Sequence, residues 1–188
     1  MITIRMEFSK DAAAREALLD LSLGETRFAK ASERLREGRR PADELSFVAT
    51  DRGCLVGTVR LWNVTAGPRR PALLLGPLAV HPDFRNRGVG DALMRHTLGA
   101  ASGLRHDCVL LVGDAPYYRR FGFSTEKTGS LWLPGLYDPN RFLAHEIKPN
   151  ALAGARGLVS ATGRLAPKPA LRTLVARVKA EAMLSHAA

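Results

Sequence analysis

The stretch that decides the fold of this chain is a basic, glycine-containing loop, Arg85-Asn-Arg-Gly-Val-Gly90. It follows an apolar run over 72–80 and a short link over 81–84, and it leads into an amphipathic segment over 91–101. This order predicts a strand, a loop and a helix. Two glycines at a helix start let backbone N–H groups approach a ligand, and the helix dipole adds positive potential there. Together with the two arginines, they predict a binding site for a pyrophosphate.

Two common phosphate-binding loops do not fit this stretch. A Walker loop would place Gly-Lys-Ser/Thr after the glycines, but Asp91 follows Gly90. A dinucleotide-binding loop would have a third glycine where this chain has Leu93. What remains is an ordered set of residues at the strand end and in the loop, namely Leu78, Val80, Pro82, Arg85, Gly88 and Gly90.

This ordered set resembles the acyl-CoA-binding motif of the GNAT superfamily of N-acetyltransferases, although an ordinary strand-to-helix turn is the alternative. A second stretch, Tyr118-x-x-x-Gly122-Phe123, also resembles the family and follows the first after one helix and one strand, as the family's order requires. The resemblance covers roughly residues 2–150 and implies a bacterial-type, single-domain member. It implies an α/β (α+β) fold, with a mixed, mostly antiparallel central sheet, a bulged strand and flanking helices. The implied activity is acetyl transfer from acetyl-CoA to a primary amine of a small molecule or protein, by direct attack.

The resemblance also implies roles for particular residues. In the family, the tyrosine of the second motif points its hydroxyl at the coenzyme sulfur, so Tyr118 is expected to be the general acid that protonates the leaving thiolate. A phenol suits this task because it stays neutral at pH 7. Packing under the Gly122 turn is the alternative role for Tyr118, and Tyr117 could exchange roles with it. The residues expected to bind acetyl-CoA, the acyl donor, are Leu78, Val80, Arg85, Asn86, Arg87, Gly88, Val89, Gly90, Asp91 and Tyr117.

The strand over 72–80 contains an unusual pair, Gly76-Pro77. Proline removes a ladder donor, so we expect a β-bulge at this point. In the GNAT fold such a bulge opens a wedge against the next strand, where the pantetheine arm lies, and a simple kink at a sheet edge is the alternative. Backbone N–H groups around 78–80 would then hydrogen-bond the thioester carbonyl.

The other elements follow from apolar periodicity and from turn residues. Strands are expected at 2–7, 45–50, 54–62, 107–112, after the turn at 121–123 and, as the last of the domain, near 142–147. Helices are expected from Ser9 to about Leu23, over 27–37, over 88–101 and at 117–120. Apolar residues on the inner face of the helix 27–37 are Phe28, Ala31 and Leu35, and those of the helix 88–101 are Val89, Ala92, Leu93 and Ala100, with His96 on the same stripe.

Neither the general base nor the amine acceptor can be identified from the sequence. Carboxylates that could act as the base are Asp114, Glu44, Glu25 and Asp43, although each also suits a cap or a solvated position. A bound water, or an amine that arrives partly neutral, would serve as well. In this fold the acceptor enters near 20–44, with the loop 129–141 opposite, and the charged residues of these stretches select no substrate.

Length and composition set broad limits. The chain has 188 residues and a formal net charge of +10, which favours anionic partners. Cys54 and Cys108 lie in apolar runs and are expected to be core residues, and no histidine spacing suits a metal. The amino terminus has no apolar leader and no stretch approaches about 18 apolar residues, so we expect a cytoplasmic protein that does not bind membranes.

Residues 1–150 are expected to form the acyltransferase domain, and 151–188 a basic extension with an amphipathic helix at about 170–184. The apolar stripe of this helix is expected to pack on the domain, with a homodimer interface as the second alternative and a membrane or nucleic acid as the third. Nucleic acid is not favoured, because the aromatic residues do not interleave with the basic ones. Two other functions stay open: a non-catalytic acyl-CoA-binding sensor or subunit, and a nucleic-acid-associated protein that uses the basic tail.

Overall fold

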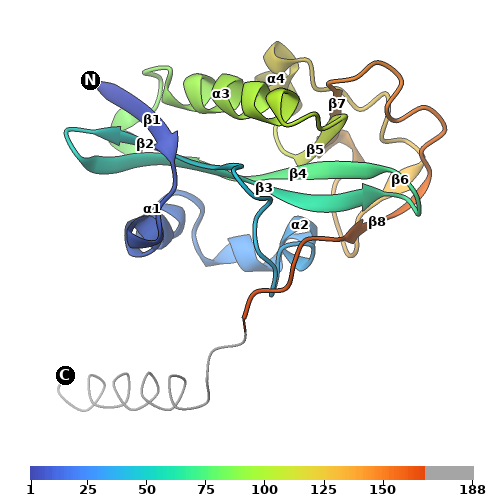
Figure 1. Ribbon diagram of the computed structural model, residues 1–188, viewed down its shortest axis with the longest axis horizontal. Helices are drawn as coiled ribbons and strands as arrows, with labels where there is room; N and C mark the ends of the chain where they lie inside the picture. Colours follow the sequence, from blue (N-terminus) through green and yellow to red (C-terminus); the bar gives the residue numbers. More distant parts are fainter. Residues whose placement is uncertain (168–188) are drawn as a thin grey trace.

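An eight-stranded, mostly antiparallel sheet forms the centre of the molecule (Figure 1). The computed structural model describes residues 1–167, apart from the side chains of residues 25 and 26. The main path of the sheet is, in spatial order, β1 (Ile2–Met6), β2 (Ser46–Asp51), β3 (Cys54–Ala66), β4 (Pro71–Val80), β5 (Cys108–Val112) and β7 (Phe142–Glu146). Along this path only the β4–β5 pair is parallel. This arrangement confirms the mixed α/β fold that the sequence predicts.

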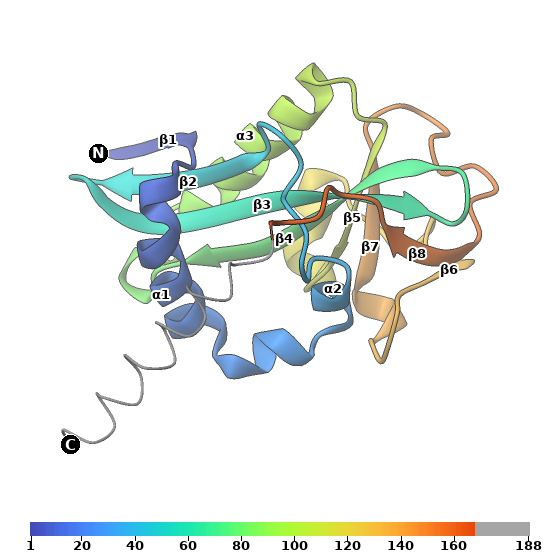
Figure 2. The same ribbon diagram turned by 60° about the horizontal axis from the view of Figure 1, so that its bottom comes forward.

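Helices cover both faces of the sheet (Figures 1 and 2). One face carries α1 (Ala12–Leu23) and α2 (Ala31–Arg34), and the opposite face carries α3 (Val89–Gly103) and α4 (Ala115–Tyr118). Short 3-10 turns lie beside these helices at Ser9–Asp11, Glu25–Ala29, Pro82–Phe84 and Arg119–Phe121, and another precedes β7 at Pro139–Arg141. Within residues 1–167, no helix has the length and apolar character needed to cross a membrane.

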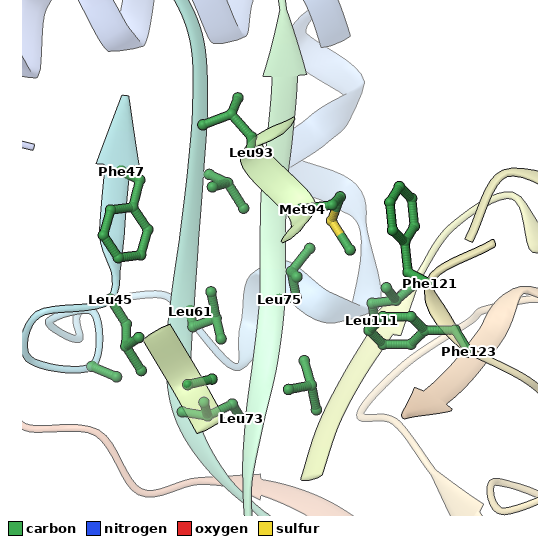
Figure 3. Packing of buried hydrophobic residues seen from close by; sticks show 14 of the residues in the cluster. Leu45, Phe47, Leu61, Leu73, Leu75, Leu93, Met94, Leu111, Phe121 and Phe123 are labelled. Carbon is green, nitrogen blue, oxygen red and sulfur yellow. The ribbon is translucent and has the colours of Figure 1, made fainter. Parts of the chain in front are cut away.

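Strand β4 is buried on both sides because each face of the sheet has its own core. Alternate side chains point to opposite faces of a strand. Leu73 and Leu75 therefore join the cluster beneath α3, whereas Ala72 and Leu74 join the cluster on the α2 side. Figure 3 shows the first cluster, in which Leu93 and Met94 of α3 meet leucines of β3 and β4. This double burial explains why the sequence of β4 is apolar without alternation.

The bulge predicted at Gly76-Pro77 is confirmed. The pairing of β3 with β4 changes register between the pairs Val59–Leu78 and Leu61–Leu75. The Trp62 indole N–H donates a hydrogen bond to the Gly76 carbonyl at 2.6 Å, which fixes the bulged peptide. Beyond the bulge, β4 separates from its other neighbour, because β5 pairs with it only at Leu73 and Leu74. The sheet is thus opened between β4 and β5.

The prediction of one helix over 27–37 is wrong, because the helical residues there are fewer and interrupted. Lys30 has an extended backbone (φ −71°, ψ 141°), which separates the 3-10 turn Glu25–Ala29 from the four-residue α2. Ala31 and Leu35 are buried as predicted, but Phe28 is 58% exposed and lies beneath the Arg27 guanidinium. The break rotates Phe28 away from the core, which periodicity alone could not show.

Three other side chains that we expected in the core are exposed. Ala92 and His96 lie on the flank of α3, because the buried positions are Val89, Leu93, Met94, Thr97 and Ala101. Cys54 is exposed at the start of β3, next to the two-residue turn Arg52-Gly53, whereas Cys108 is buried in β5 as expected. Both thiols are unpaired.

The sheet continues past the strand that we expected to be its last. β8 (Gly157–Ala161) pairs with β3 at Val64–Ala66, beyond the end of β2, and also with the two-residue β6 (Leu131–Trp132). Leu152, Ala155 and Val159 are buried in the core on the α2 side. The segment assigned to the extension therefore contributes a strand to the sheet. The helix expected at 170–184 lies outside the described residues.

Candidate functional site

A cavity of about 700 Å³ lies where β4 and β5 separate. Its walls come from the second half of β4, the loop before α3, the end of β5, α4 and α2. The cavity brings together every predicted site residue except Arg87: Leu78, Val80, Arg85, Asn86, Gly88, Val89, Gly90, Asp91, Tyr117 and Tyr118. Arg87 instead lies with its guanidinium 5.3 Å from the centre of the Phe84 ring. Two motifs that are far apart in sequence thus share one space.

The loop before α3 has the backbone conformation of an anion site. Asn86 (φ 60°) and Gly88 (φ 75°) are both left-handed, a conformation that glycine and asparagine tolerate best. The Gly88 carbonyl accepts the first helical hydrogen bond, from Ala92 N–H at 2.9 Å, so α3 begins there and its first amides face the loop. Arg85 donates from Nε to the Val80 carbonyl at 3.5 Å, which holds it over the strand end. The first N–H groups of α3, the positive end of its dipole and the Arg85 guanidinium therefore lie close together at this loop.

Tyr117 is held against the first turn of α3. A Cβ on Gly90 would lie 2.7 Å from the Tyr117 hydroxyl oxygen, so only glycine permits this approach. The Arg120 guanidinium lies 4.8 Å from the centre of the Tyr117 ring and 3.4 Å from the Asp91 carboxylate. Burial, and next the nearby Asp91, raise the pKa of Tyr117 well above its ordinary value. Tyr117 is therefore a neutral phenol that forms part of the loop's wall.

Tyr118 packs over the end of β5, where Gly113 has no side chain. A Cβ on Gly113 would overlap Cε2 of the Tyr118 ring and lie 2.8 Å from Cδ2. The ring also meets Tyr117 and Phe123 edge to face, with centroids 4.9 Å and 6.0 Å away. Burial raises the pKa of Tyr118 to about 12, although the Arg141 guanidinium opposes this shift. The hydroxyl is thus protonated at neutral pH and can donate a proton.

The α2 side of the cavity carries residues that the sequence did not identify as site residues. Arg36 is buried, donates to Ser32 from Nε and Nη2 at 3.1 Å, and lies 3.0 Å from the Glu33 carboxylate. Lys30 lines the cavity from the extended segment before α2, and Arg141 from the turn before β7. No local pattern marks these positions, because the helix break at Lys30 and the chain path from β6 to β7 place them there.

The candidate bases lie in different parts of the structure. Asp114 lines the cavity with its side chain exposed. Asp43 pairs with Arg164 at 3.1 Å, and Glu44 lies in the turn before β2; neither is part of the cavity wall. The side chain of Glu25 lies outside the described part of the chain. Across residues 1–167, no group of three or more His, Cys, Asp or Glu side chains is placed to hold a metal ion.

Comparisons with known proteins point to one family. The family model for the acetyltransferase (GNAT) domain matches residues 42–125. The chain is 31% identical over 158 residues to the uncharacterized N-acetyltransferase YhbS of Escherichia coli, covering 83% of this chain and 93% of YhbS. The crystal structure of YhbS in complex with CoA aligns with a TM-score of 0.71 at 32% identity, covering 86% of this chain and 89% of that one. A GNAT family acetyltransferase from Brucella melitensis in complex with acetyl-CoA aligns with a TM-score of 0.64 at 26% identity, covering 86% and 96%.

Proposed function

Because this chain belongs to the GNAT family of acetyltransferases, we propose that it transfers an acetyl group from acetyl-CoA to a primary amine of a small molecule or protein, with Tyr118 as the general acid. The observation that carries this proposal is the single cavity in which the Arg85–Gly90 loop and Tyr118 meet. The complexes of its relatives with CoA and acetyl-CoA support the same donor for this chain.

We assign the parts of acetyl-CoA to successive parts of the cavity. The loop suits the pyrophosphate, because left-handed glycine, helix amides and Arg85 all favour anions. The open wedge suits the extended pantetheine arm, since the β4 backbone beyond Leu74 has no partner strand on the β5 side within the described chain. Backbone N–H groups of β4 that face the wedge would polarise the thioester carbonyl, a kind of contact commonly worth about 3–4 kcal/mol in the transition state.

The reaction then needs two proton transfers. The amine nitrogen attacks the carbonyl carbon, the C–S bond breaks, and the departing thiolate takes a proton from the Tyr118 hydroxyl, which then regains a proton from water. A phenol with a pKa of about 12 is fully protonated at pH 7, so it is available as a donor throughout the neutral range. The surplus proton of the attacking amine leaves to water or to Asp114, which is the candidate carboxylate that lines the cavity. We place this chemistry in the cytoplasm, where unpaired thiols such as Cys54 are usual.

Acetyl-CoA binding is the first test of this proposal. Acetyl-CoA at 100 times its dissociation constant should add about 2.7 kcal/mol to the unfolding free energy and raise the melting temperature. NADH and ATP are the controls, because they carry phosphates without a pantetheine arm. A saturable shift with acetyl-CoA alone is the expected result. The absence of any shift up to millimolar acetyl-CoA would contradict the proposal.

A further inference from the structure

The part of the cavity nearest α2 carries more positive than negative charge. Lys30, Arg36 and Arg141 line it, and the carboxylates of Glu33 on α2 and of Asp114 after β5 are the acids near them among the described residues. Arg27 also lines the cavity, but its charge is balanced by ion pairs with Glu16 at 2.7 Å and Asp20 at 2.9 Å. Three cations therefore face two acids, one of which, Glu33, is paired with Arg36.

Two of these cations have no acidic partner among the described side chains. Arg36 is paired with Glu33, whereas neither Lys30 nor Arg141 forms an ion pair with a residue that the structure describes. Burial lowers the pKa of the Lys30 ammonium, and the charges of Arg141 and Arg36 lower it further. Like charges held together repel, so an anion placed among them would be stabilised.

This group of cations is separate from the loop that suits the coenzyme pyrophosphate. Lys30 and Arg36 come from the segment on the α1–α2 face of the sheet, whereas the loop begins α3 on the opposite face (Figures 1 and 2). Along β4, Gly76 beside Arg36 and Val80 before the loop are four residues apart, or roughly 13 Å of strand. One phosphate group could not contact both.

The same cations lie next to the expected reaction centre. Arg36 Nη1 lies 3.6 Å from the position that a Cβ on Gly76 would take, so it faces the bulge. Arg141 donates from Nε to the Gly113 carbonyl at 3.4 Å, and the Tyr118 ring packs on this same glycine. A ligand anion held here would place the rest of that ligand between the bulge and Tyr118.

We propose that the acceptor amine carries an oxyanion, a carboxylate or a phosphate, which Lys30, Arg36 and Arg141 bind while the amine faces the thioester. This inference rests on the proposed acetyltransferase function for the role of the ligand, but the anion site itself does not. Positive charge opposite a carboxylate or phosphate gives short, charge-assisted hydrogen bonds, and a guanidinium can make two in parallel.

The test measures anion binding to protein saturated with CoA, so that the loop before α3 is already filled. Inorganic phosphate and succinate are titrated separately by calorimetry, which shows whether a phosphate or a carboxylate fits better. Lys30→Gln and Arg141→Gln should each weaken binding about tenfold, since each removes a charge-assisted contact. Arg34→Gln is the matched control, because this exposed arginine of α2 lies against Gly135, is not part of the cavity wall and should leave binding unchanged.

Arg36 is tested by Arg36→Lys, which keeps the buried charge but removes the planar donor fork; it should weaken anion binding without preventing CoA binding. A CoA-saturated protein that binds neither anion, or equal losses in the control and the test variants, would overturn the inference. If the protein binds no CoA at all, the proposed function fails instead, and the anion titrations still decide whether the cationic site exists. Turnover gives a second measure: O-phosphoethanolamine and β-alanine should be acetylated with a higher kcat/KM than ethanolamine and β-alaninamide.

Discussion

At the scale of single residues, the missing side chain of Gly113 is what allows Tyr118 to reach the cavity. Gly113→Ala would place a Cβ inside the Tyr118 ring, so the ring must move. We expect this variant to resemble Tyr118→Phe: kcat falls about a hundredfold, a typical loss for a general acid, while the dissociation constant of acetyl-CoA changes little. Steady-state kinetics and calorimetry measure the two quantities.

The control for this prediction is Gly99→Ala. A Cβ on Gly99, in the middle of α3, would meet nothing within 4 Å, and alanine is the better helix former. This variant should keep full turnover and gain up to about 1 kcal/mol of stability. Full turnover in both Tyr118→Phe and Gly113→Ala would show that Tyr118 is not the acid.

Residues with a local sequence signal lie in the cavity wall where the sequence predicts a site. Gly88 and Gly90 follow a spacing whose purpose, close backbone approach, can be stated without a structure, and both lie in the cavity wall. Arg36 and Arg141 carry no such local mark. Their place depends on how distant elements meet, so the sequence predicted the stretches 20–44 and 129–141 around the acceptor but not these particular side chains.

At the scale of elements, an ion pair ties β1 to the start of α1. Arg5 donates to both oxygens of the Asp11 carboxylate, at 2.6 and 2.9 Å, and Phe8 N–H donates to the same group at 2.8 Å. The hydrogen bonds from Arg5 lower the pKa of Asp11 from an ordinary 3.8 to about 2. Because the native state favours the ionised form, its contribution to stability is fully present above about pH 4 and is lost as the pH falls through about 2.

Asp11→Asn should therefore lower the unfolding free energy at pH 7 by about 1–2 kcal/mol. The difference from wild type should shrink between pH 4 and pH 2, and denaturant unfolding at each pH measures it. Asp43→Asn is the control, because the side chains of Asp43 and its partner Arg164 are 73% and 78% exposed. An ion pair this exposed contributes little to stability. A pH-independent loss in Asp11→Asn would argue against the ion pair as its cause.

Elements with a strong local signal were predicted well, and the exceptions have physical causes. The bulge in β4 follows from a proline that cannot donate to the ladder, and the turn at Arg52-Gly53 follows from a glycine that accepts positive φ. The prediction of a helix over 27–37 is wrong because the backbone of Lys30 is extended in the middle of a helical sequence pattern. Helix propensity is summed over many residues, so it cannot reveal a single residue with an extended backbone.

At the scale of the whole molecule, the boundary of the domain decides which fragments fold. We propose that the acyltransferase domain extends beyond residue 150, because β8 pairs with β3 and buries Val159 completely. A protein of residues 1–150 should lose at least about 3 kcal/mol relative to 1–167, since it uncovers Val64 and removes Leu152 and Val159 from the core. Thermal melting of the two proteins compares them; equal melting temperatures would place the boundary at 150.

The sequence could not predict the pairing of β8 with β3. The segment around β8 is rich in glycine and alanine and has little periodicity, and its partner on β3 lies about ninety residues earlier, at Val64–Ala66 against Val159–Ala161. Pairing between such distant segments depends on which edge of the sheet is free. That edge is free because β2 begins at Ser46, opposite Arg60, and so leaves the last residues of β3 without β2 as a partner.

The separation of β4 from β5 also has a mechanical consequence. Across the middle of the sheet, the backbones of β4 and β5 are joined by only two residue pairs, Leu73 with Val109 and Leu74 with Leu110. Few backbone hydrogen bonds therefore join the part of the sheet that leads into the loop before α3 to the part that ends near Tyr118. If acetyl-CoA lies in the wedge as we propose, its contacts with both strands would bridge this opening and help to set the distance between the loop and Tyr118.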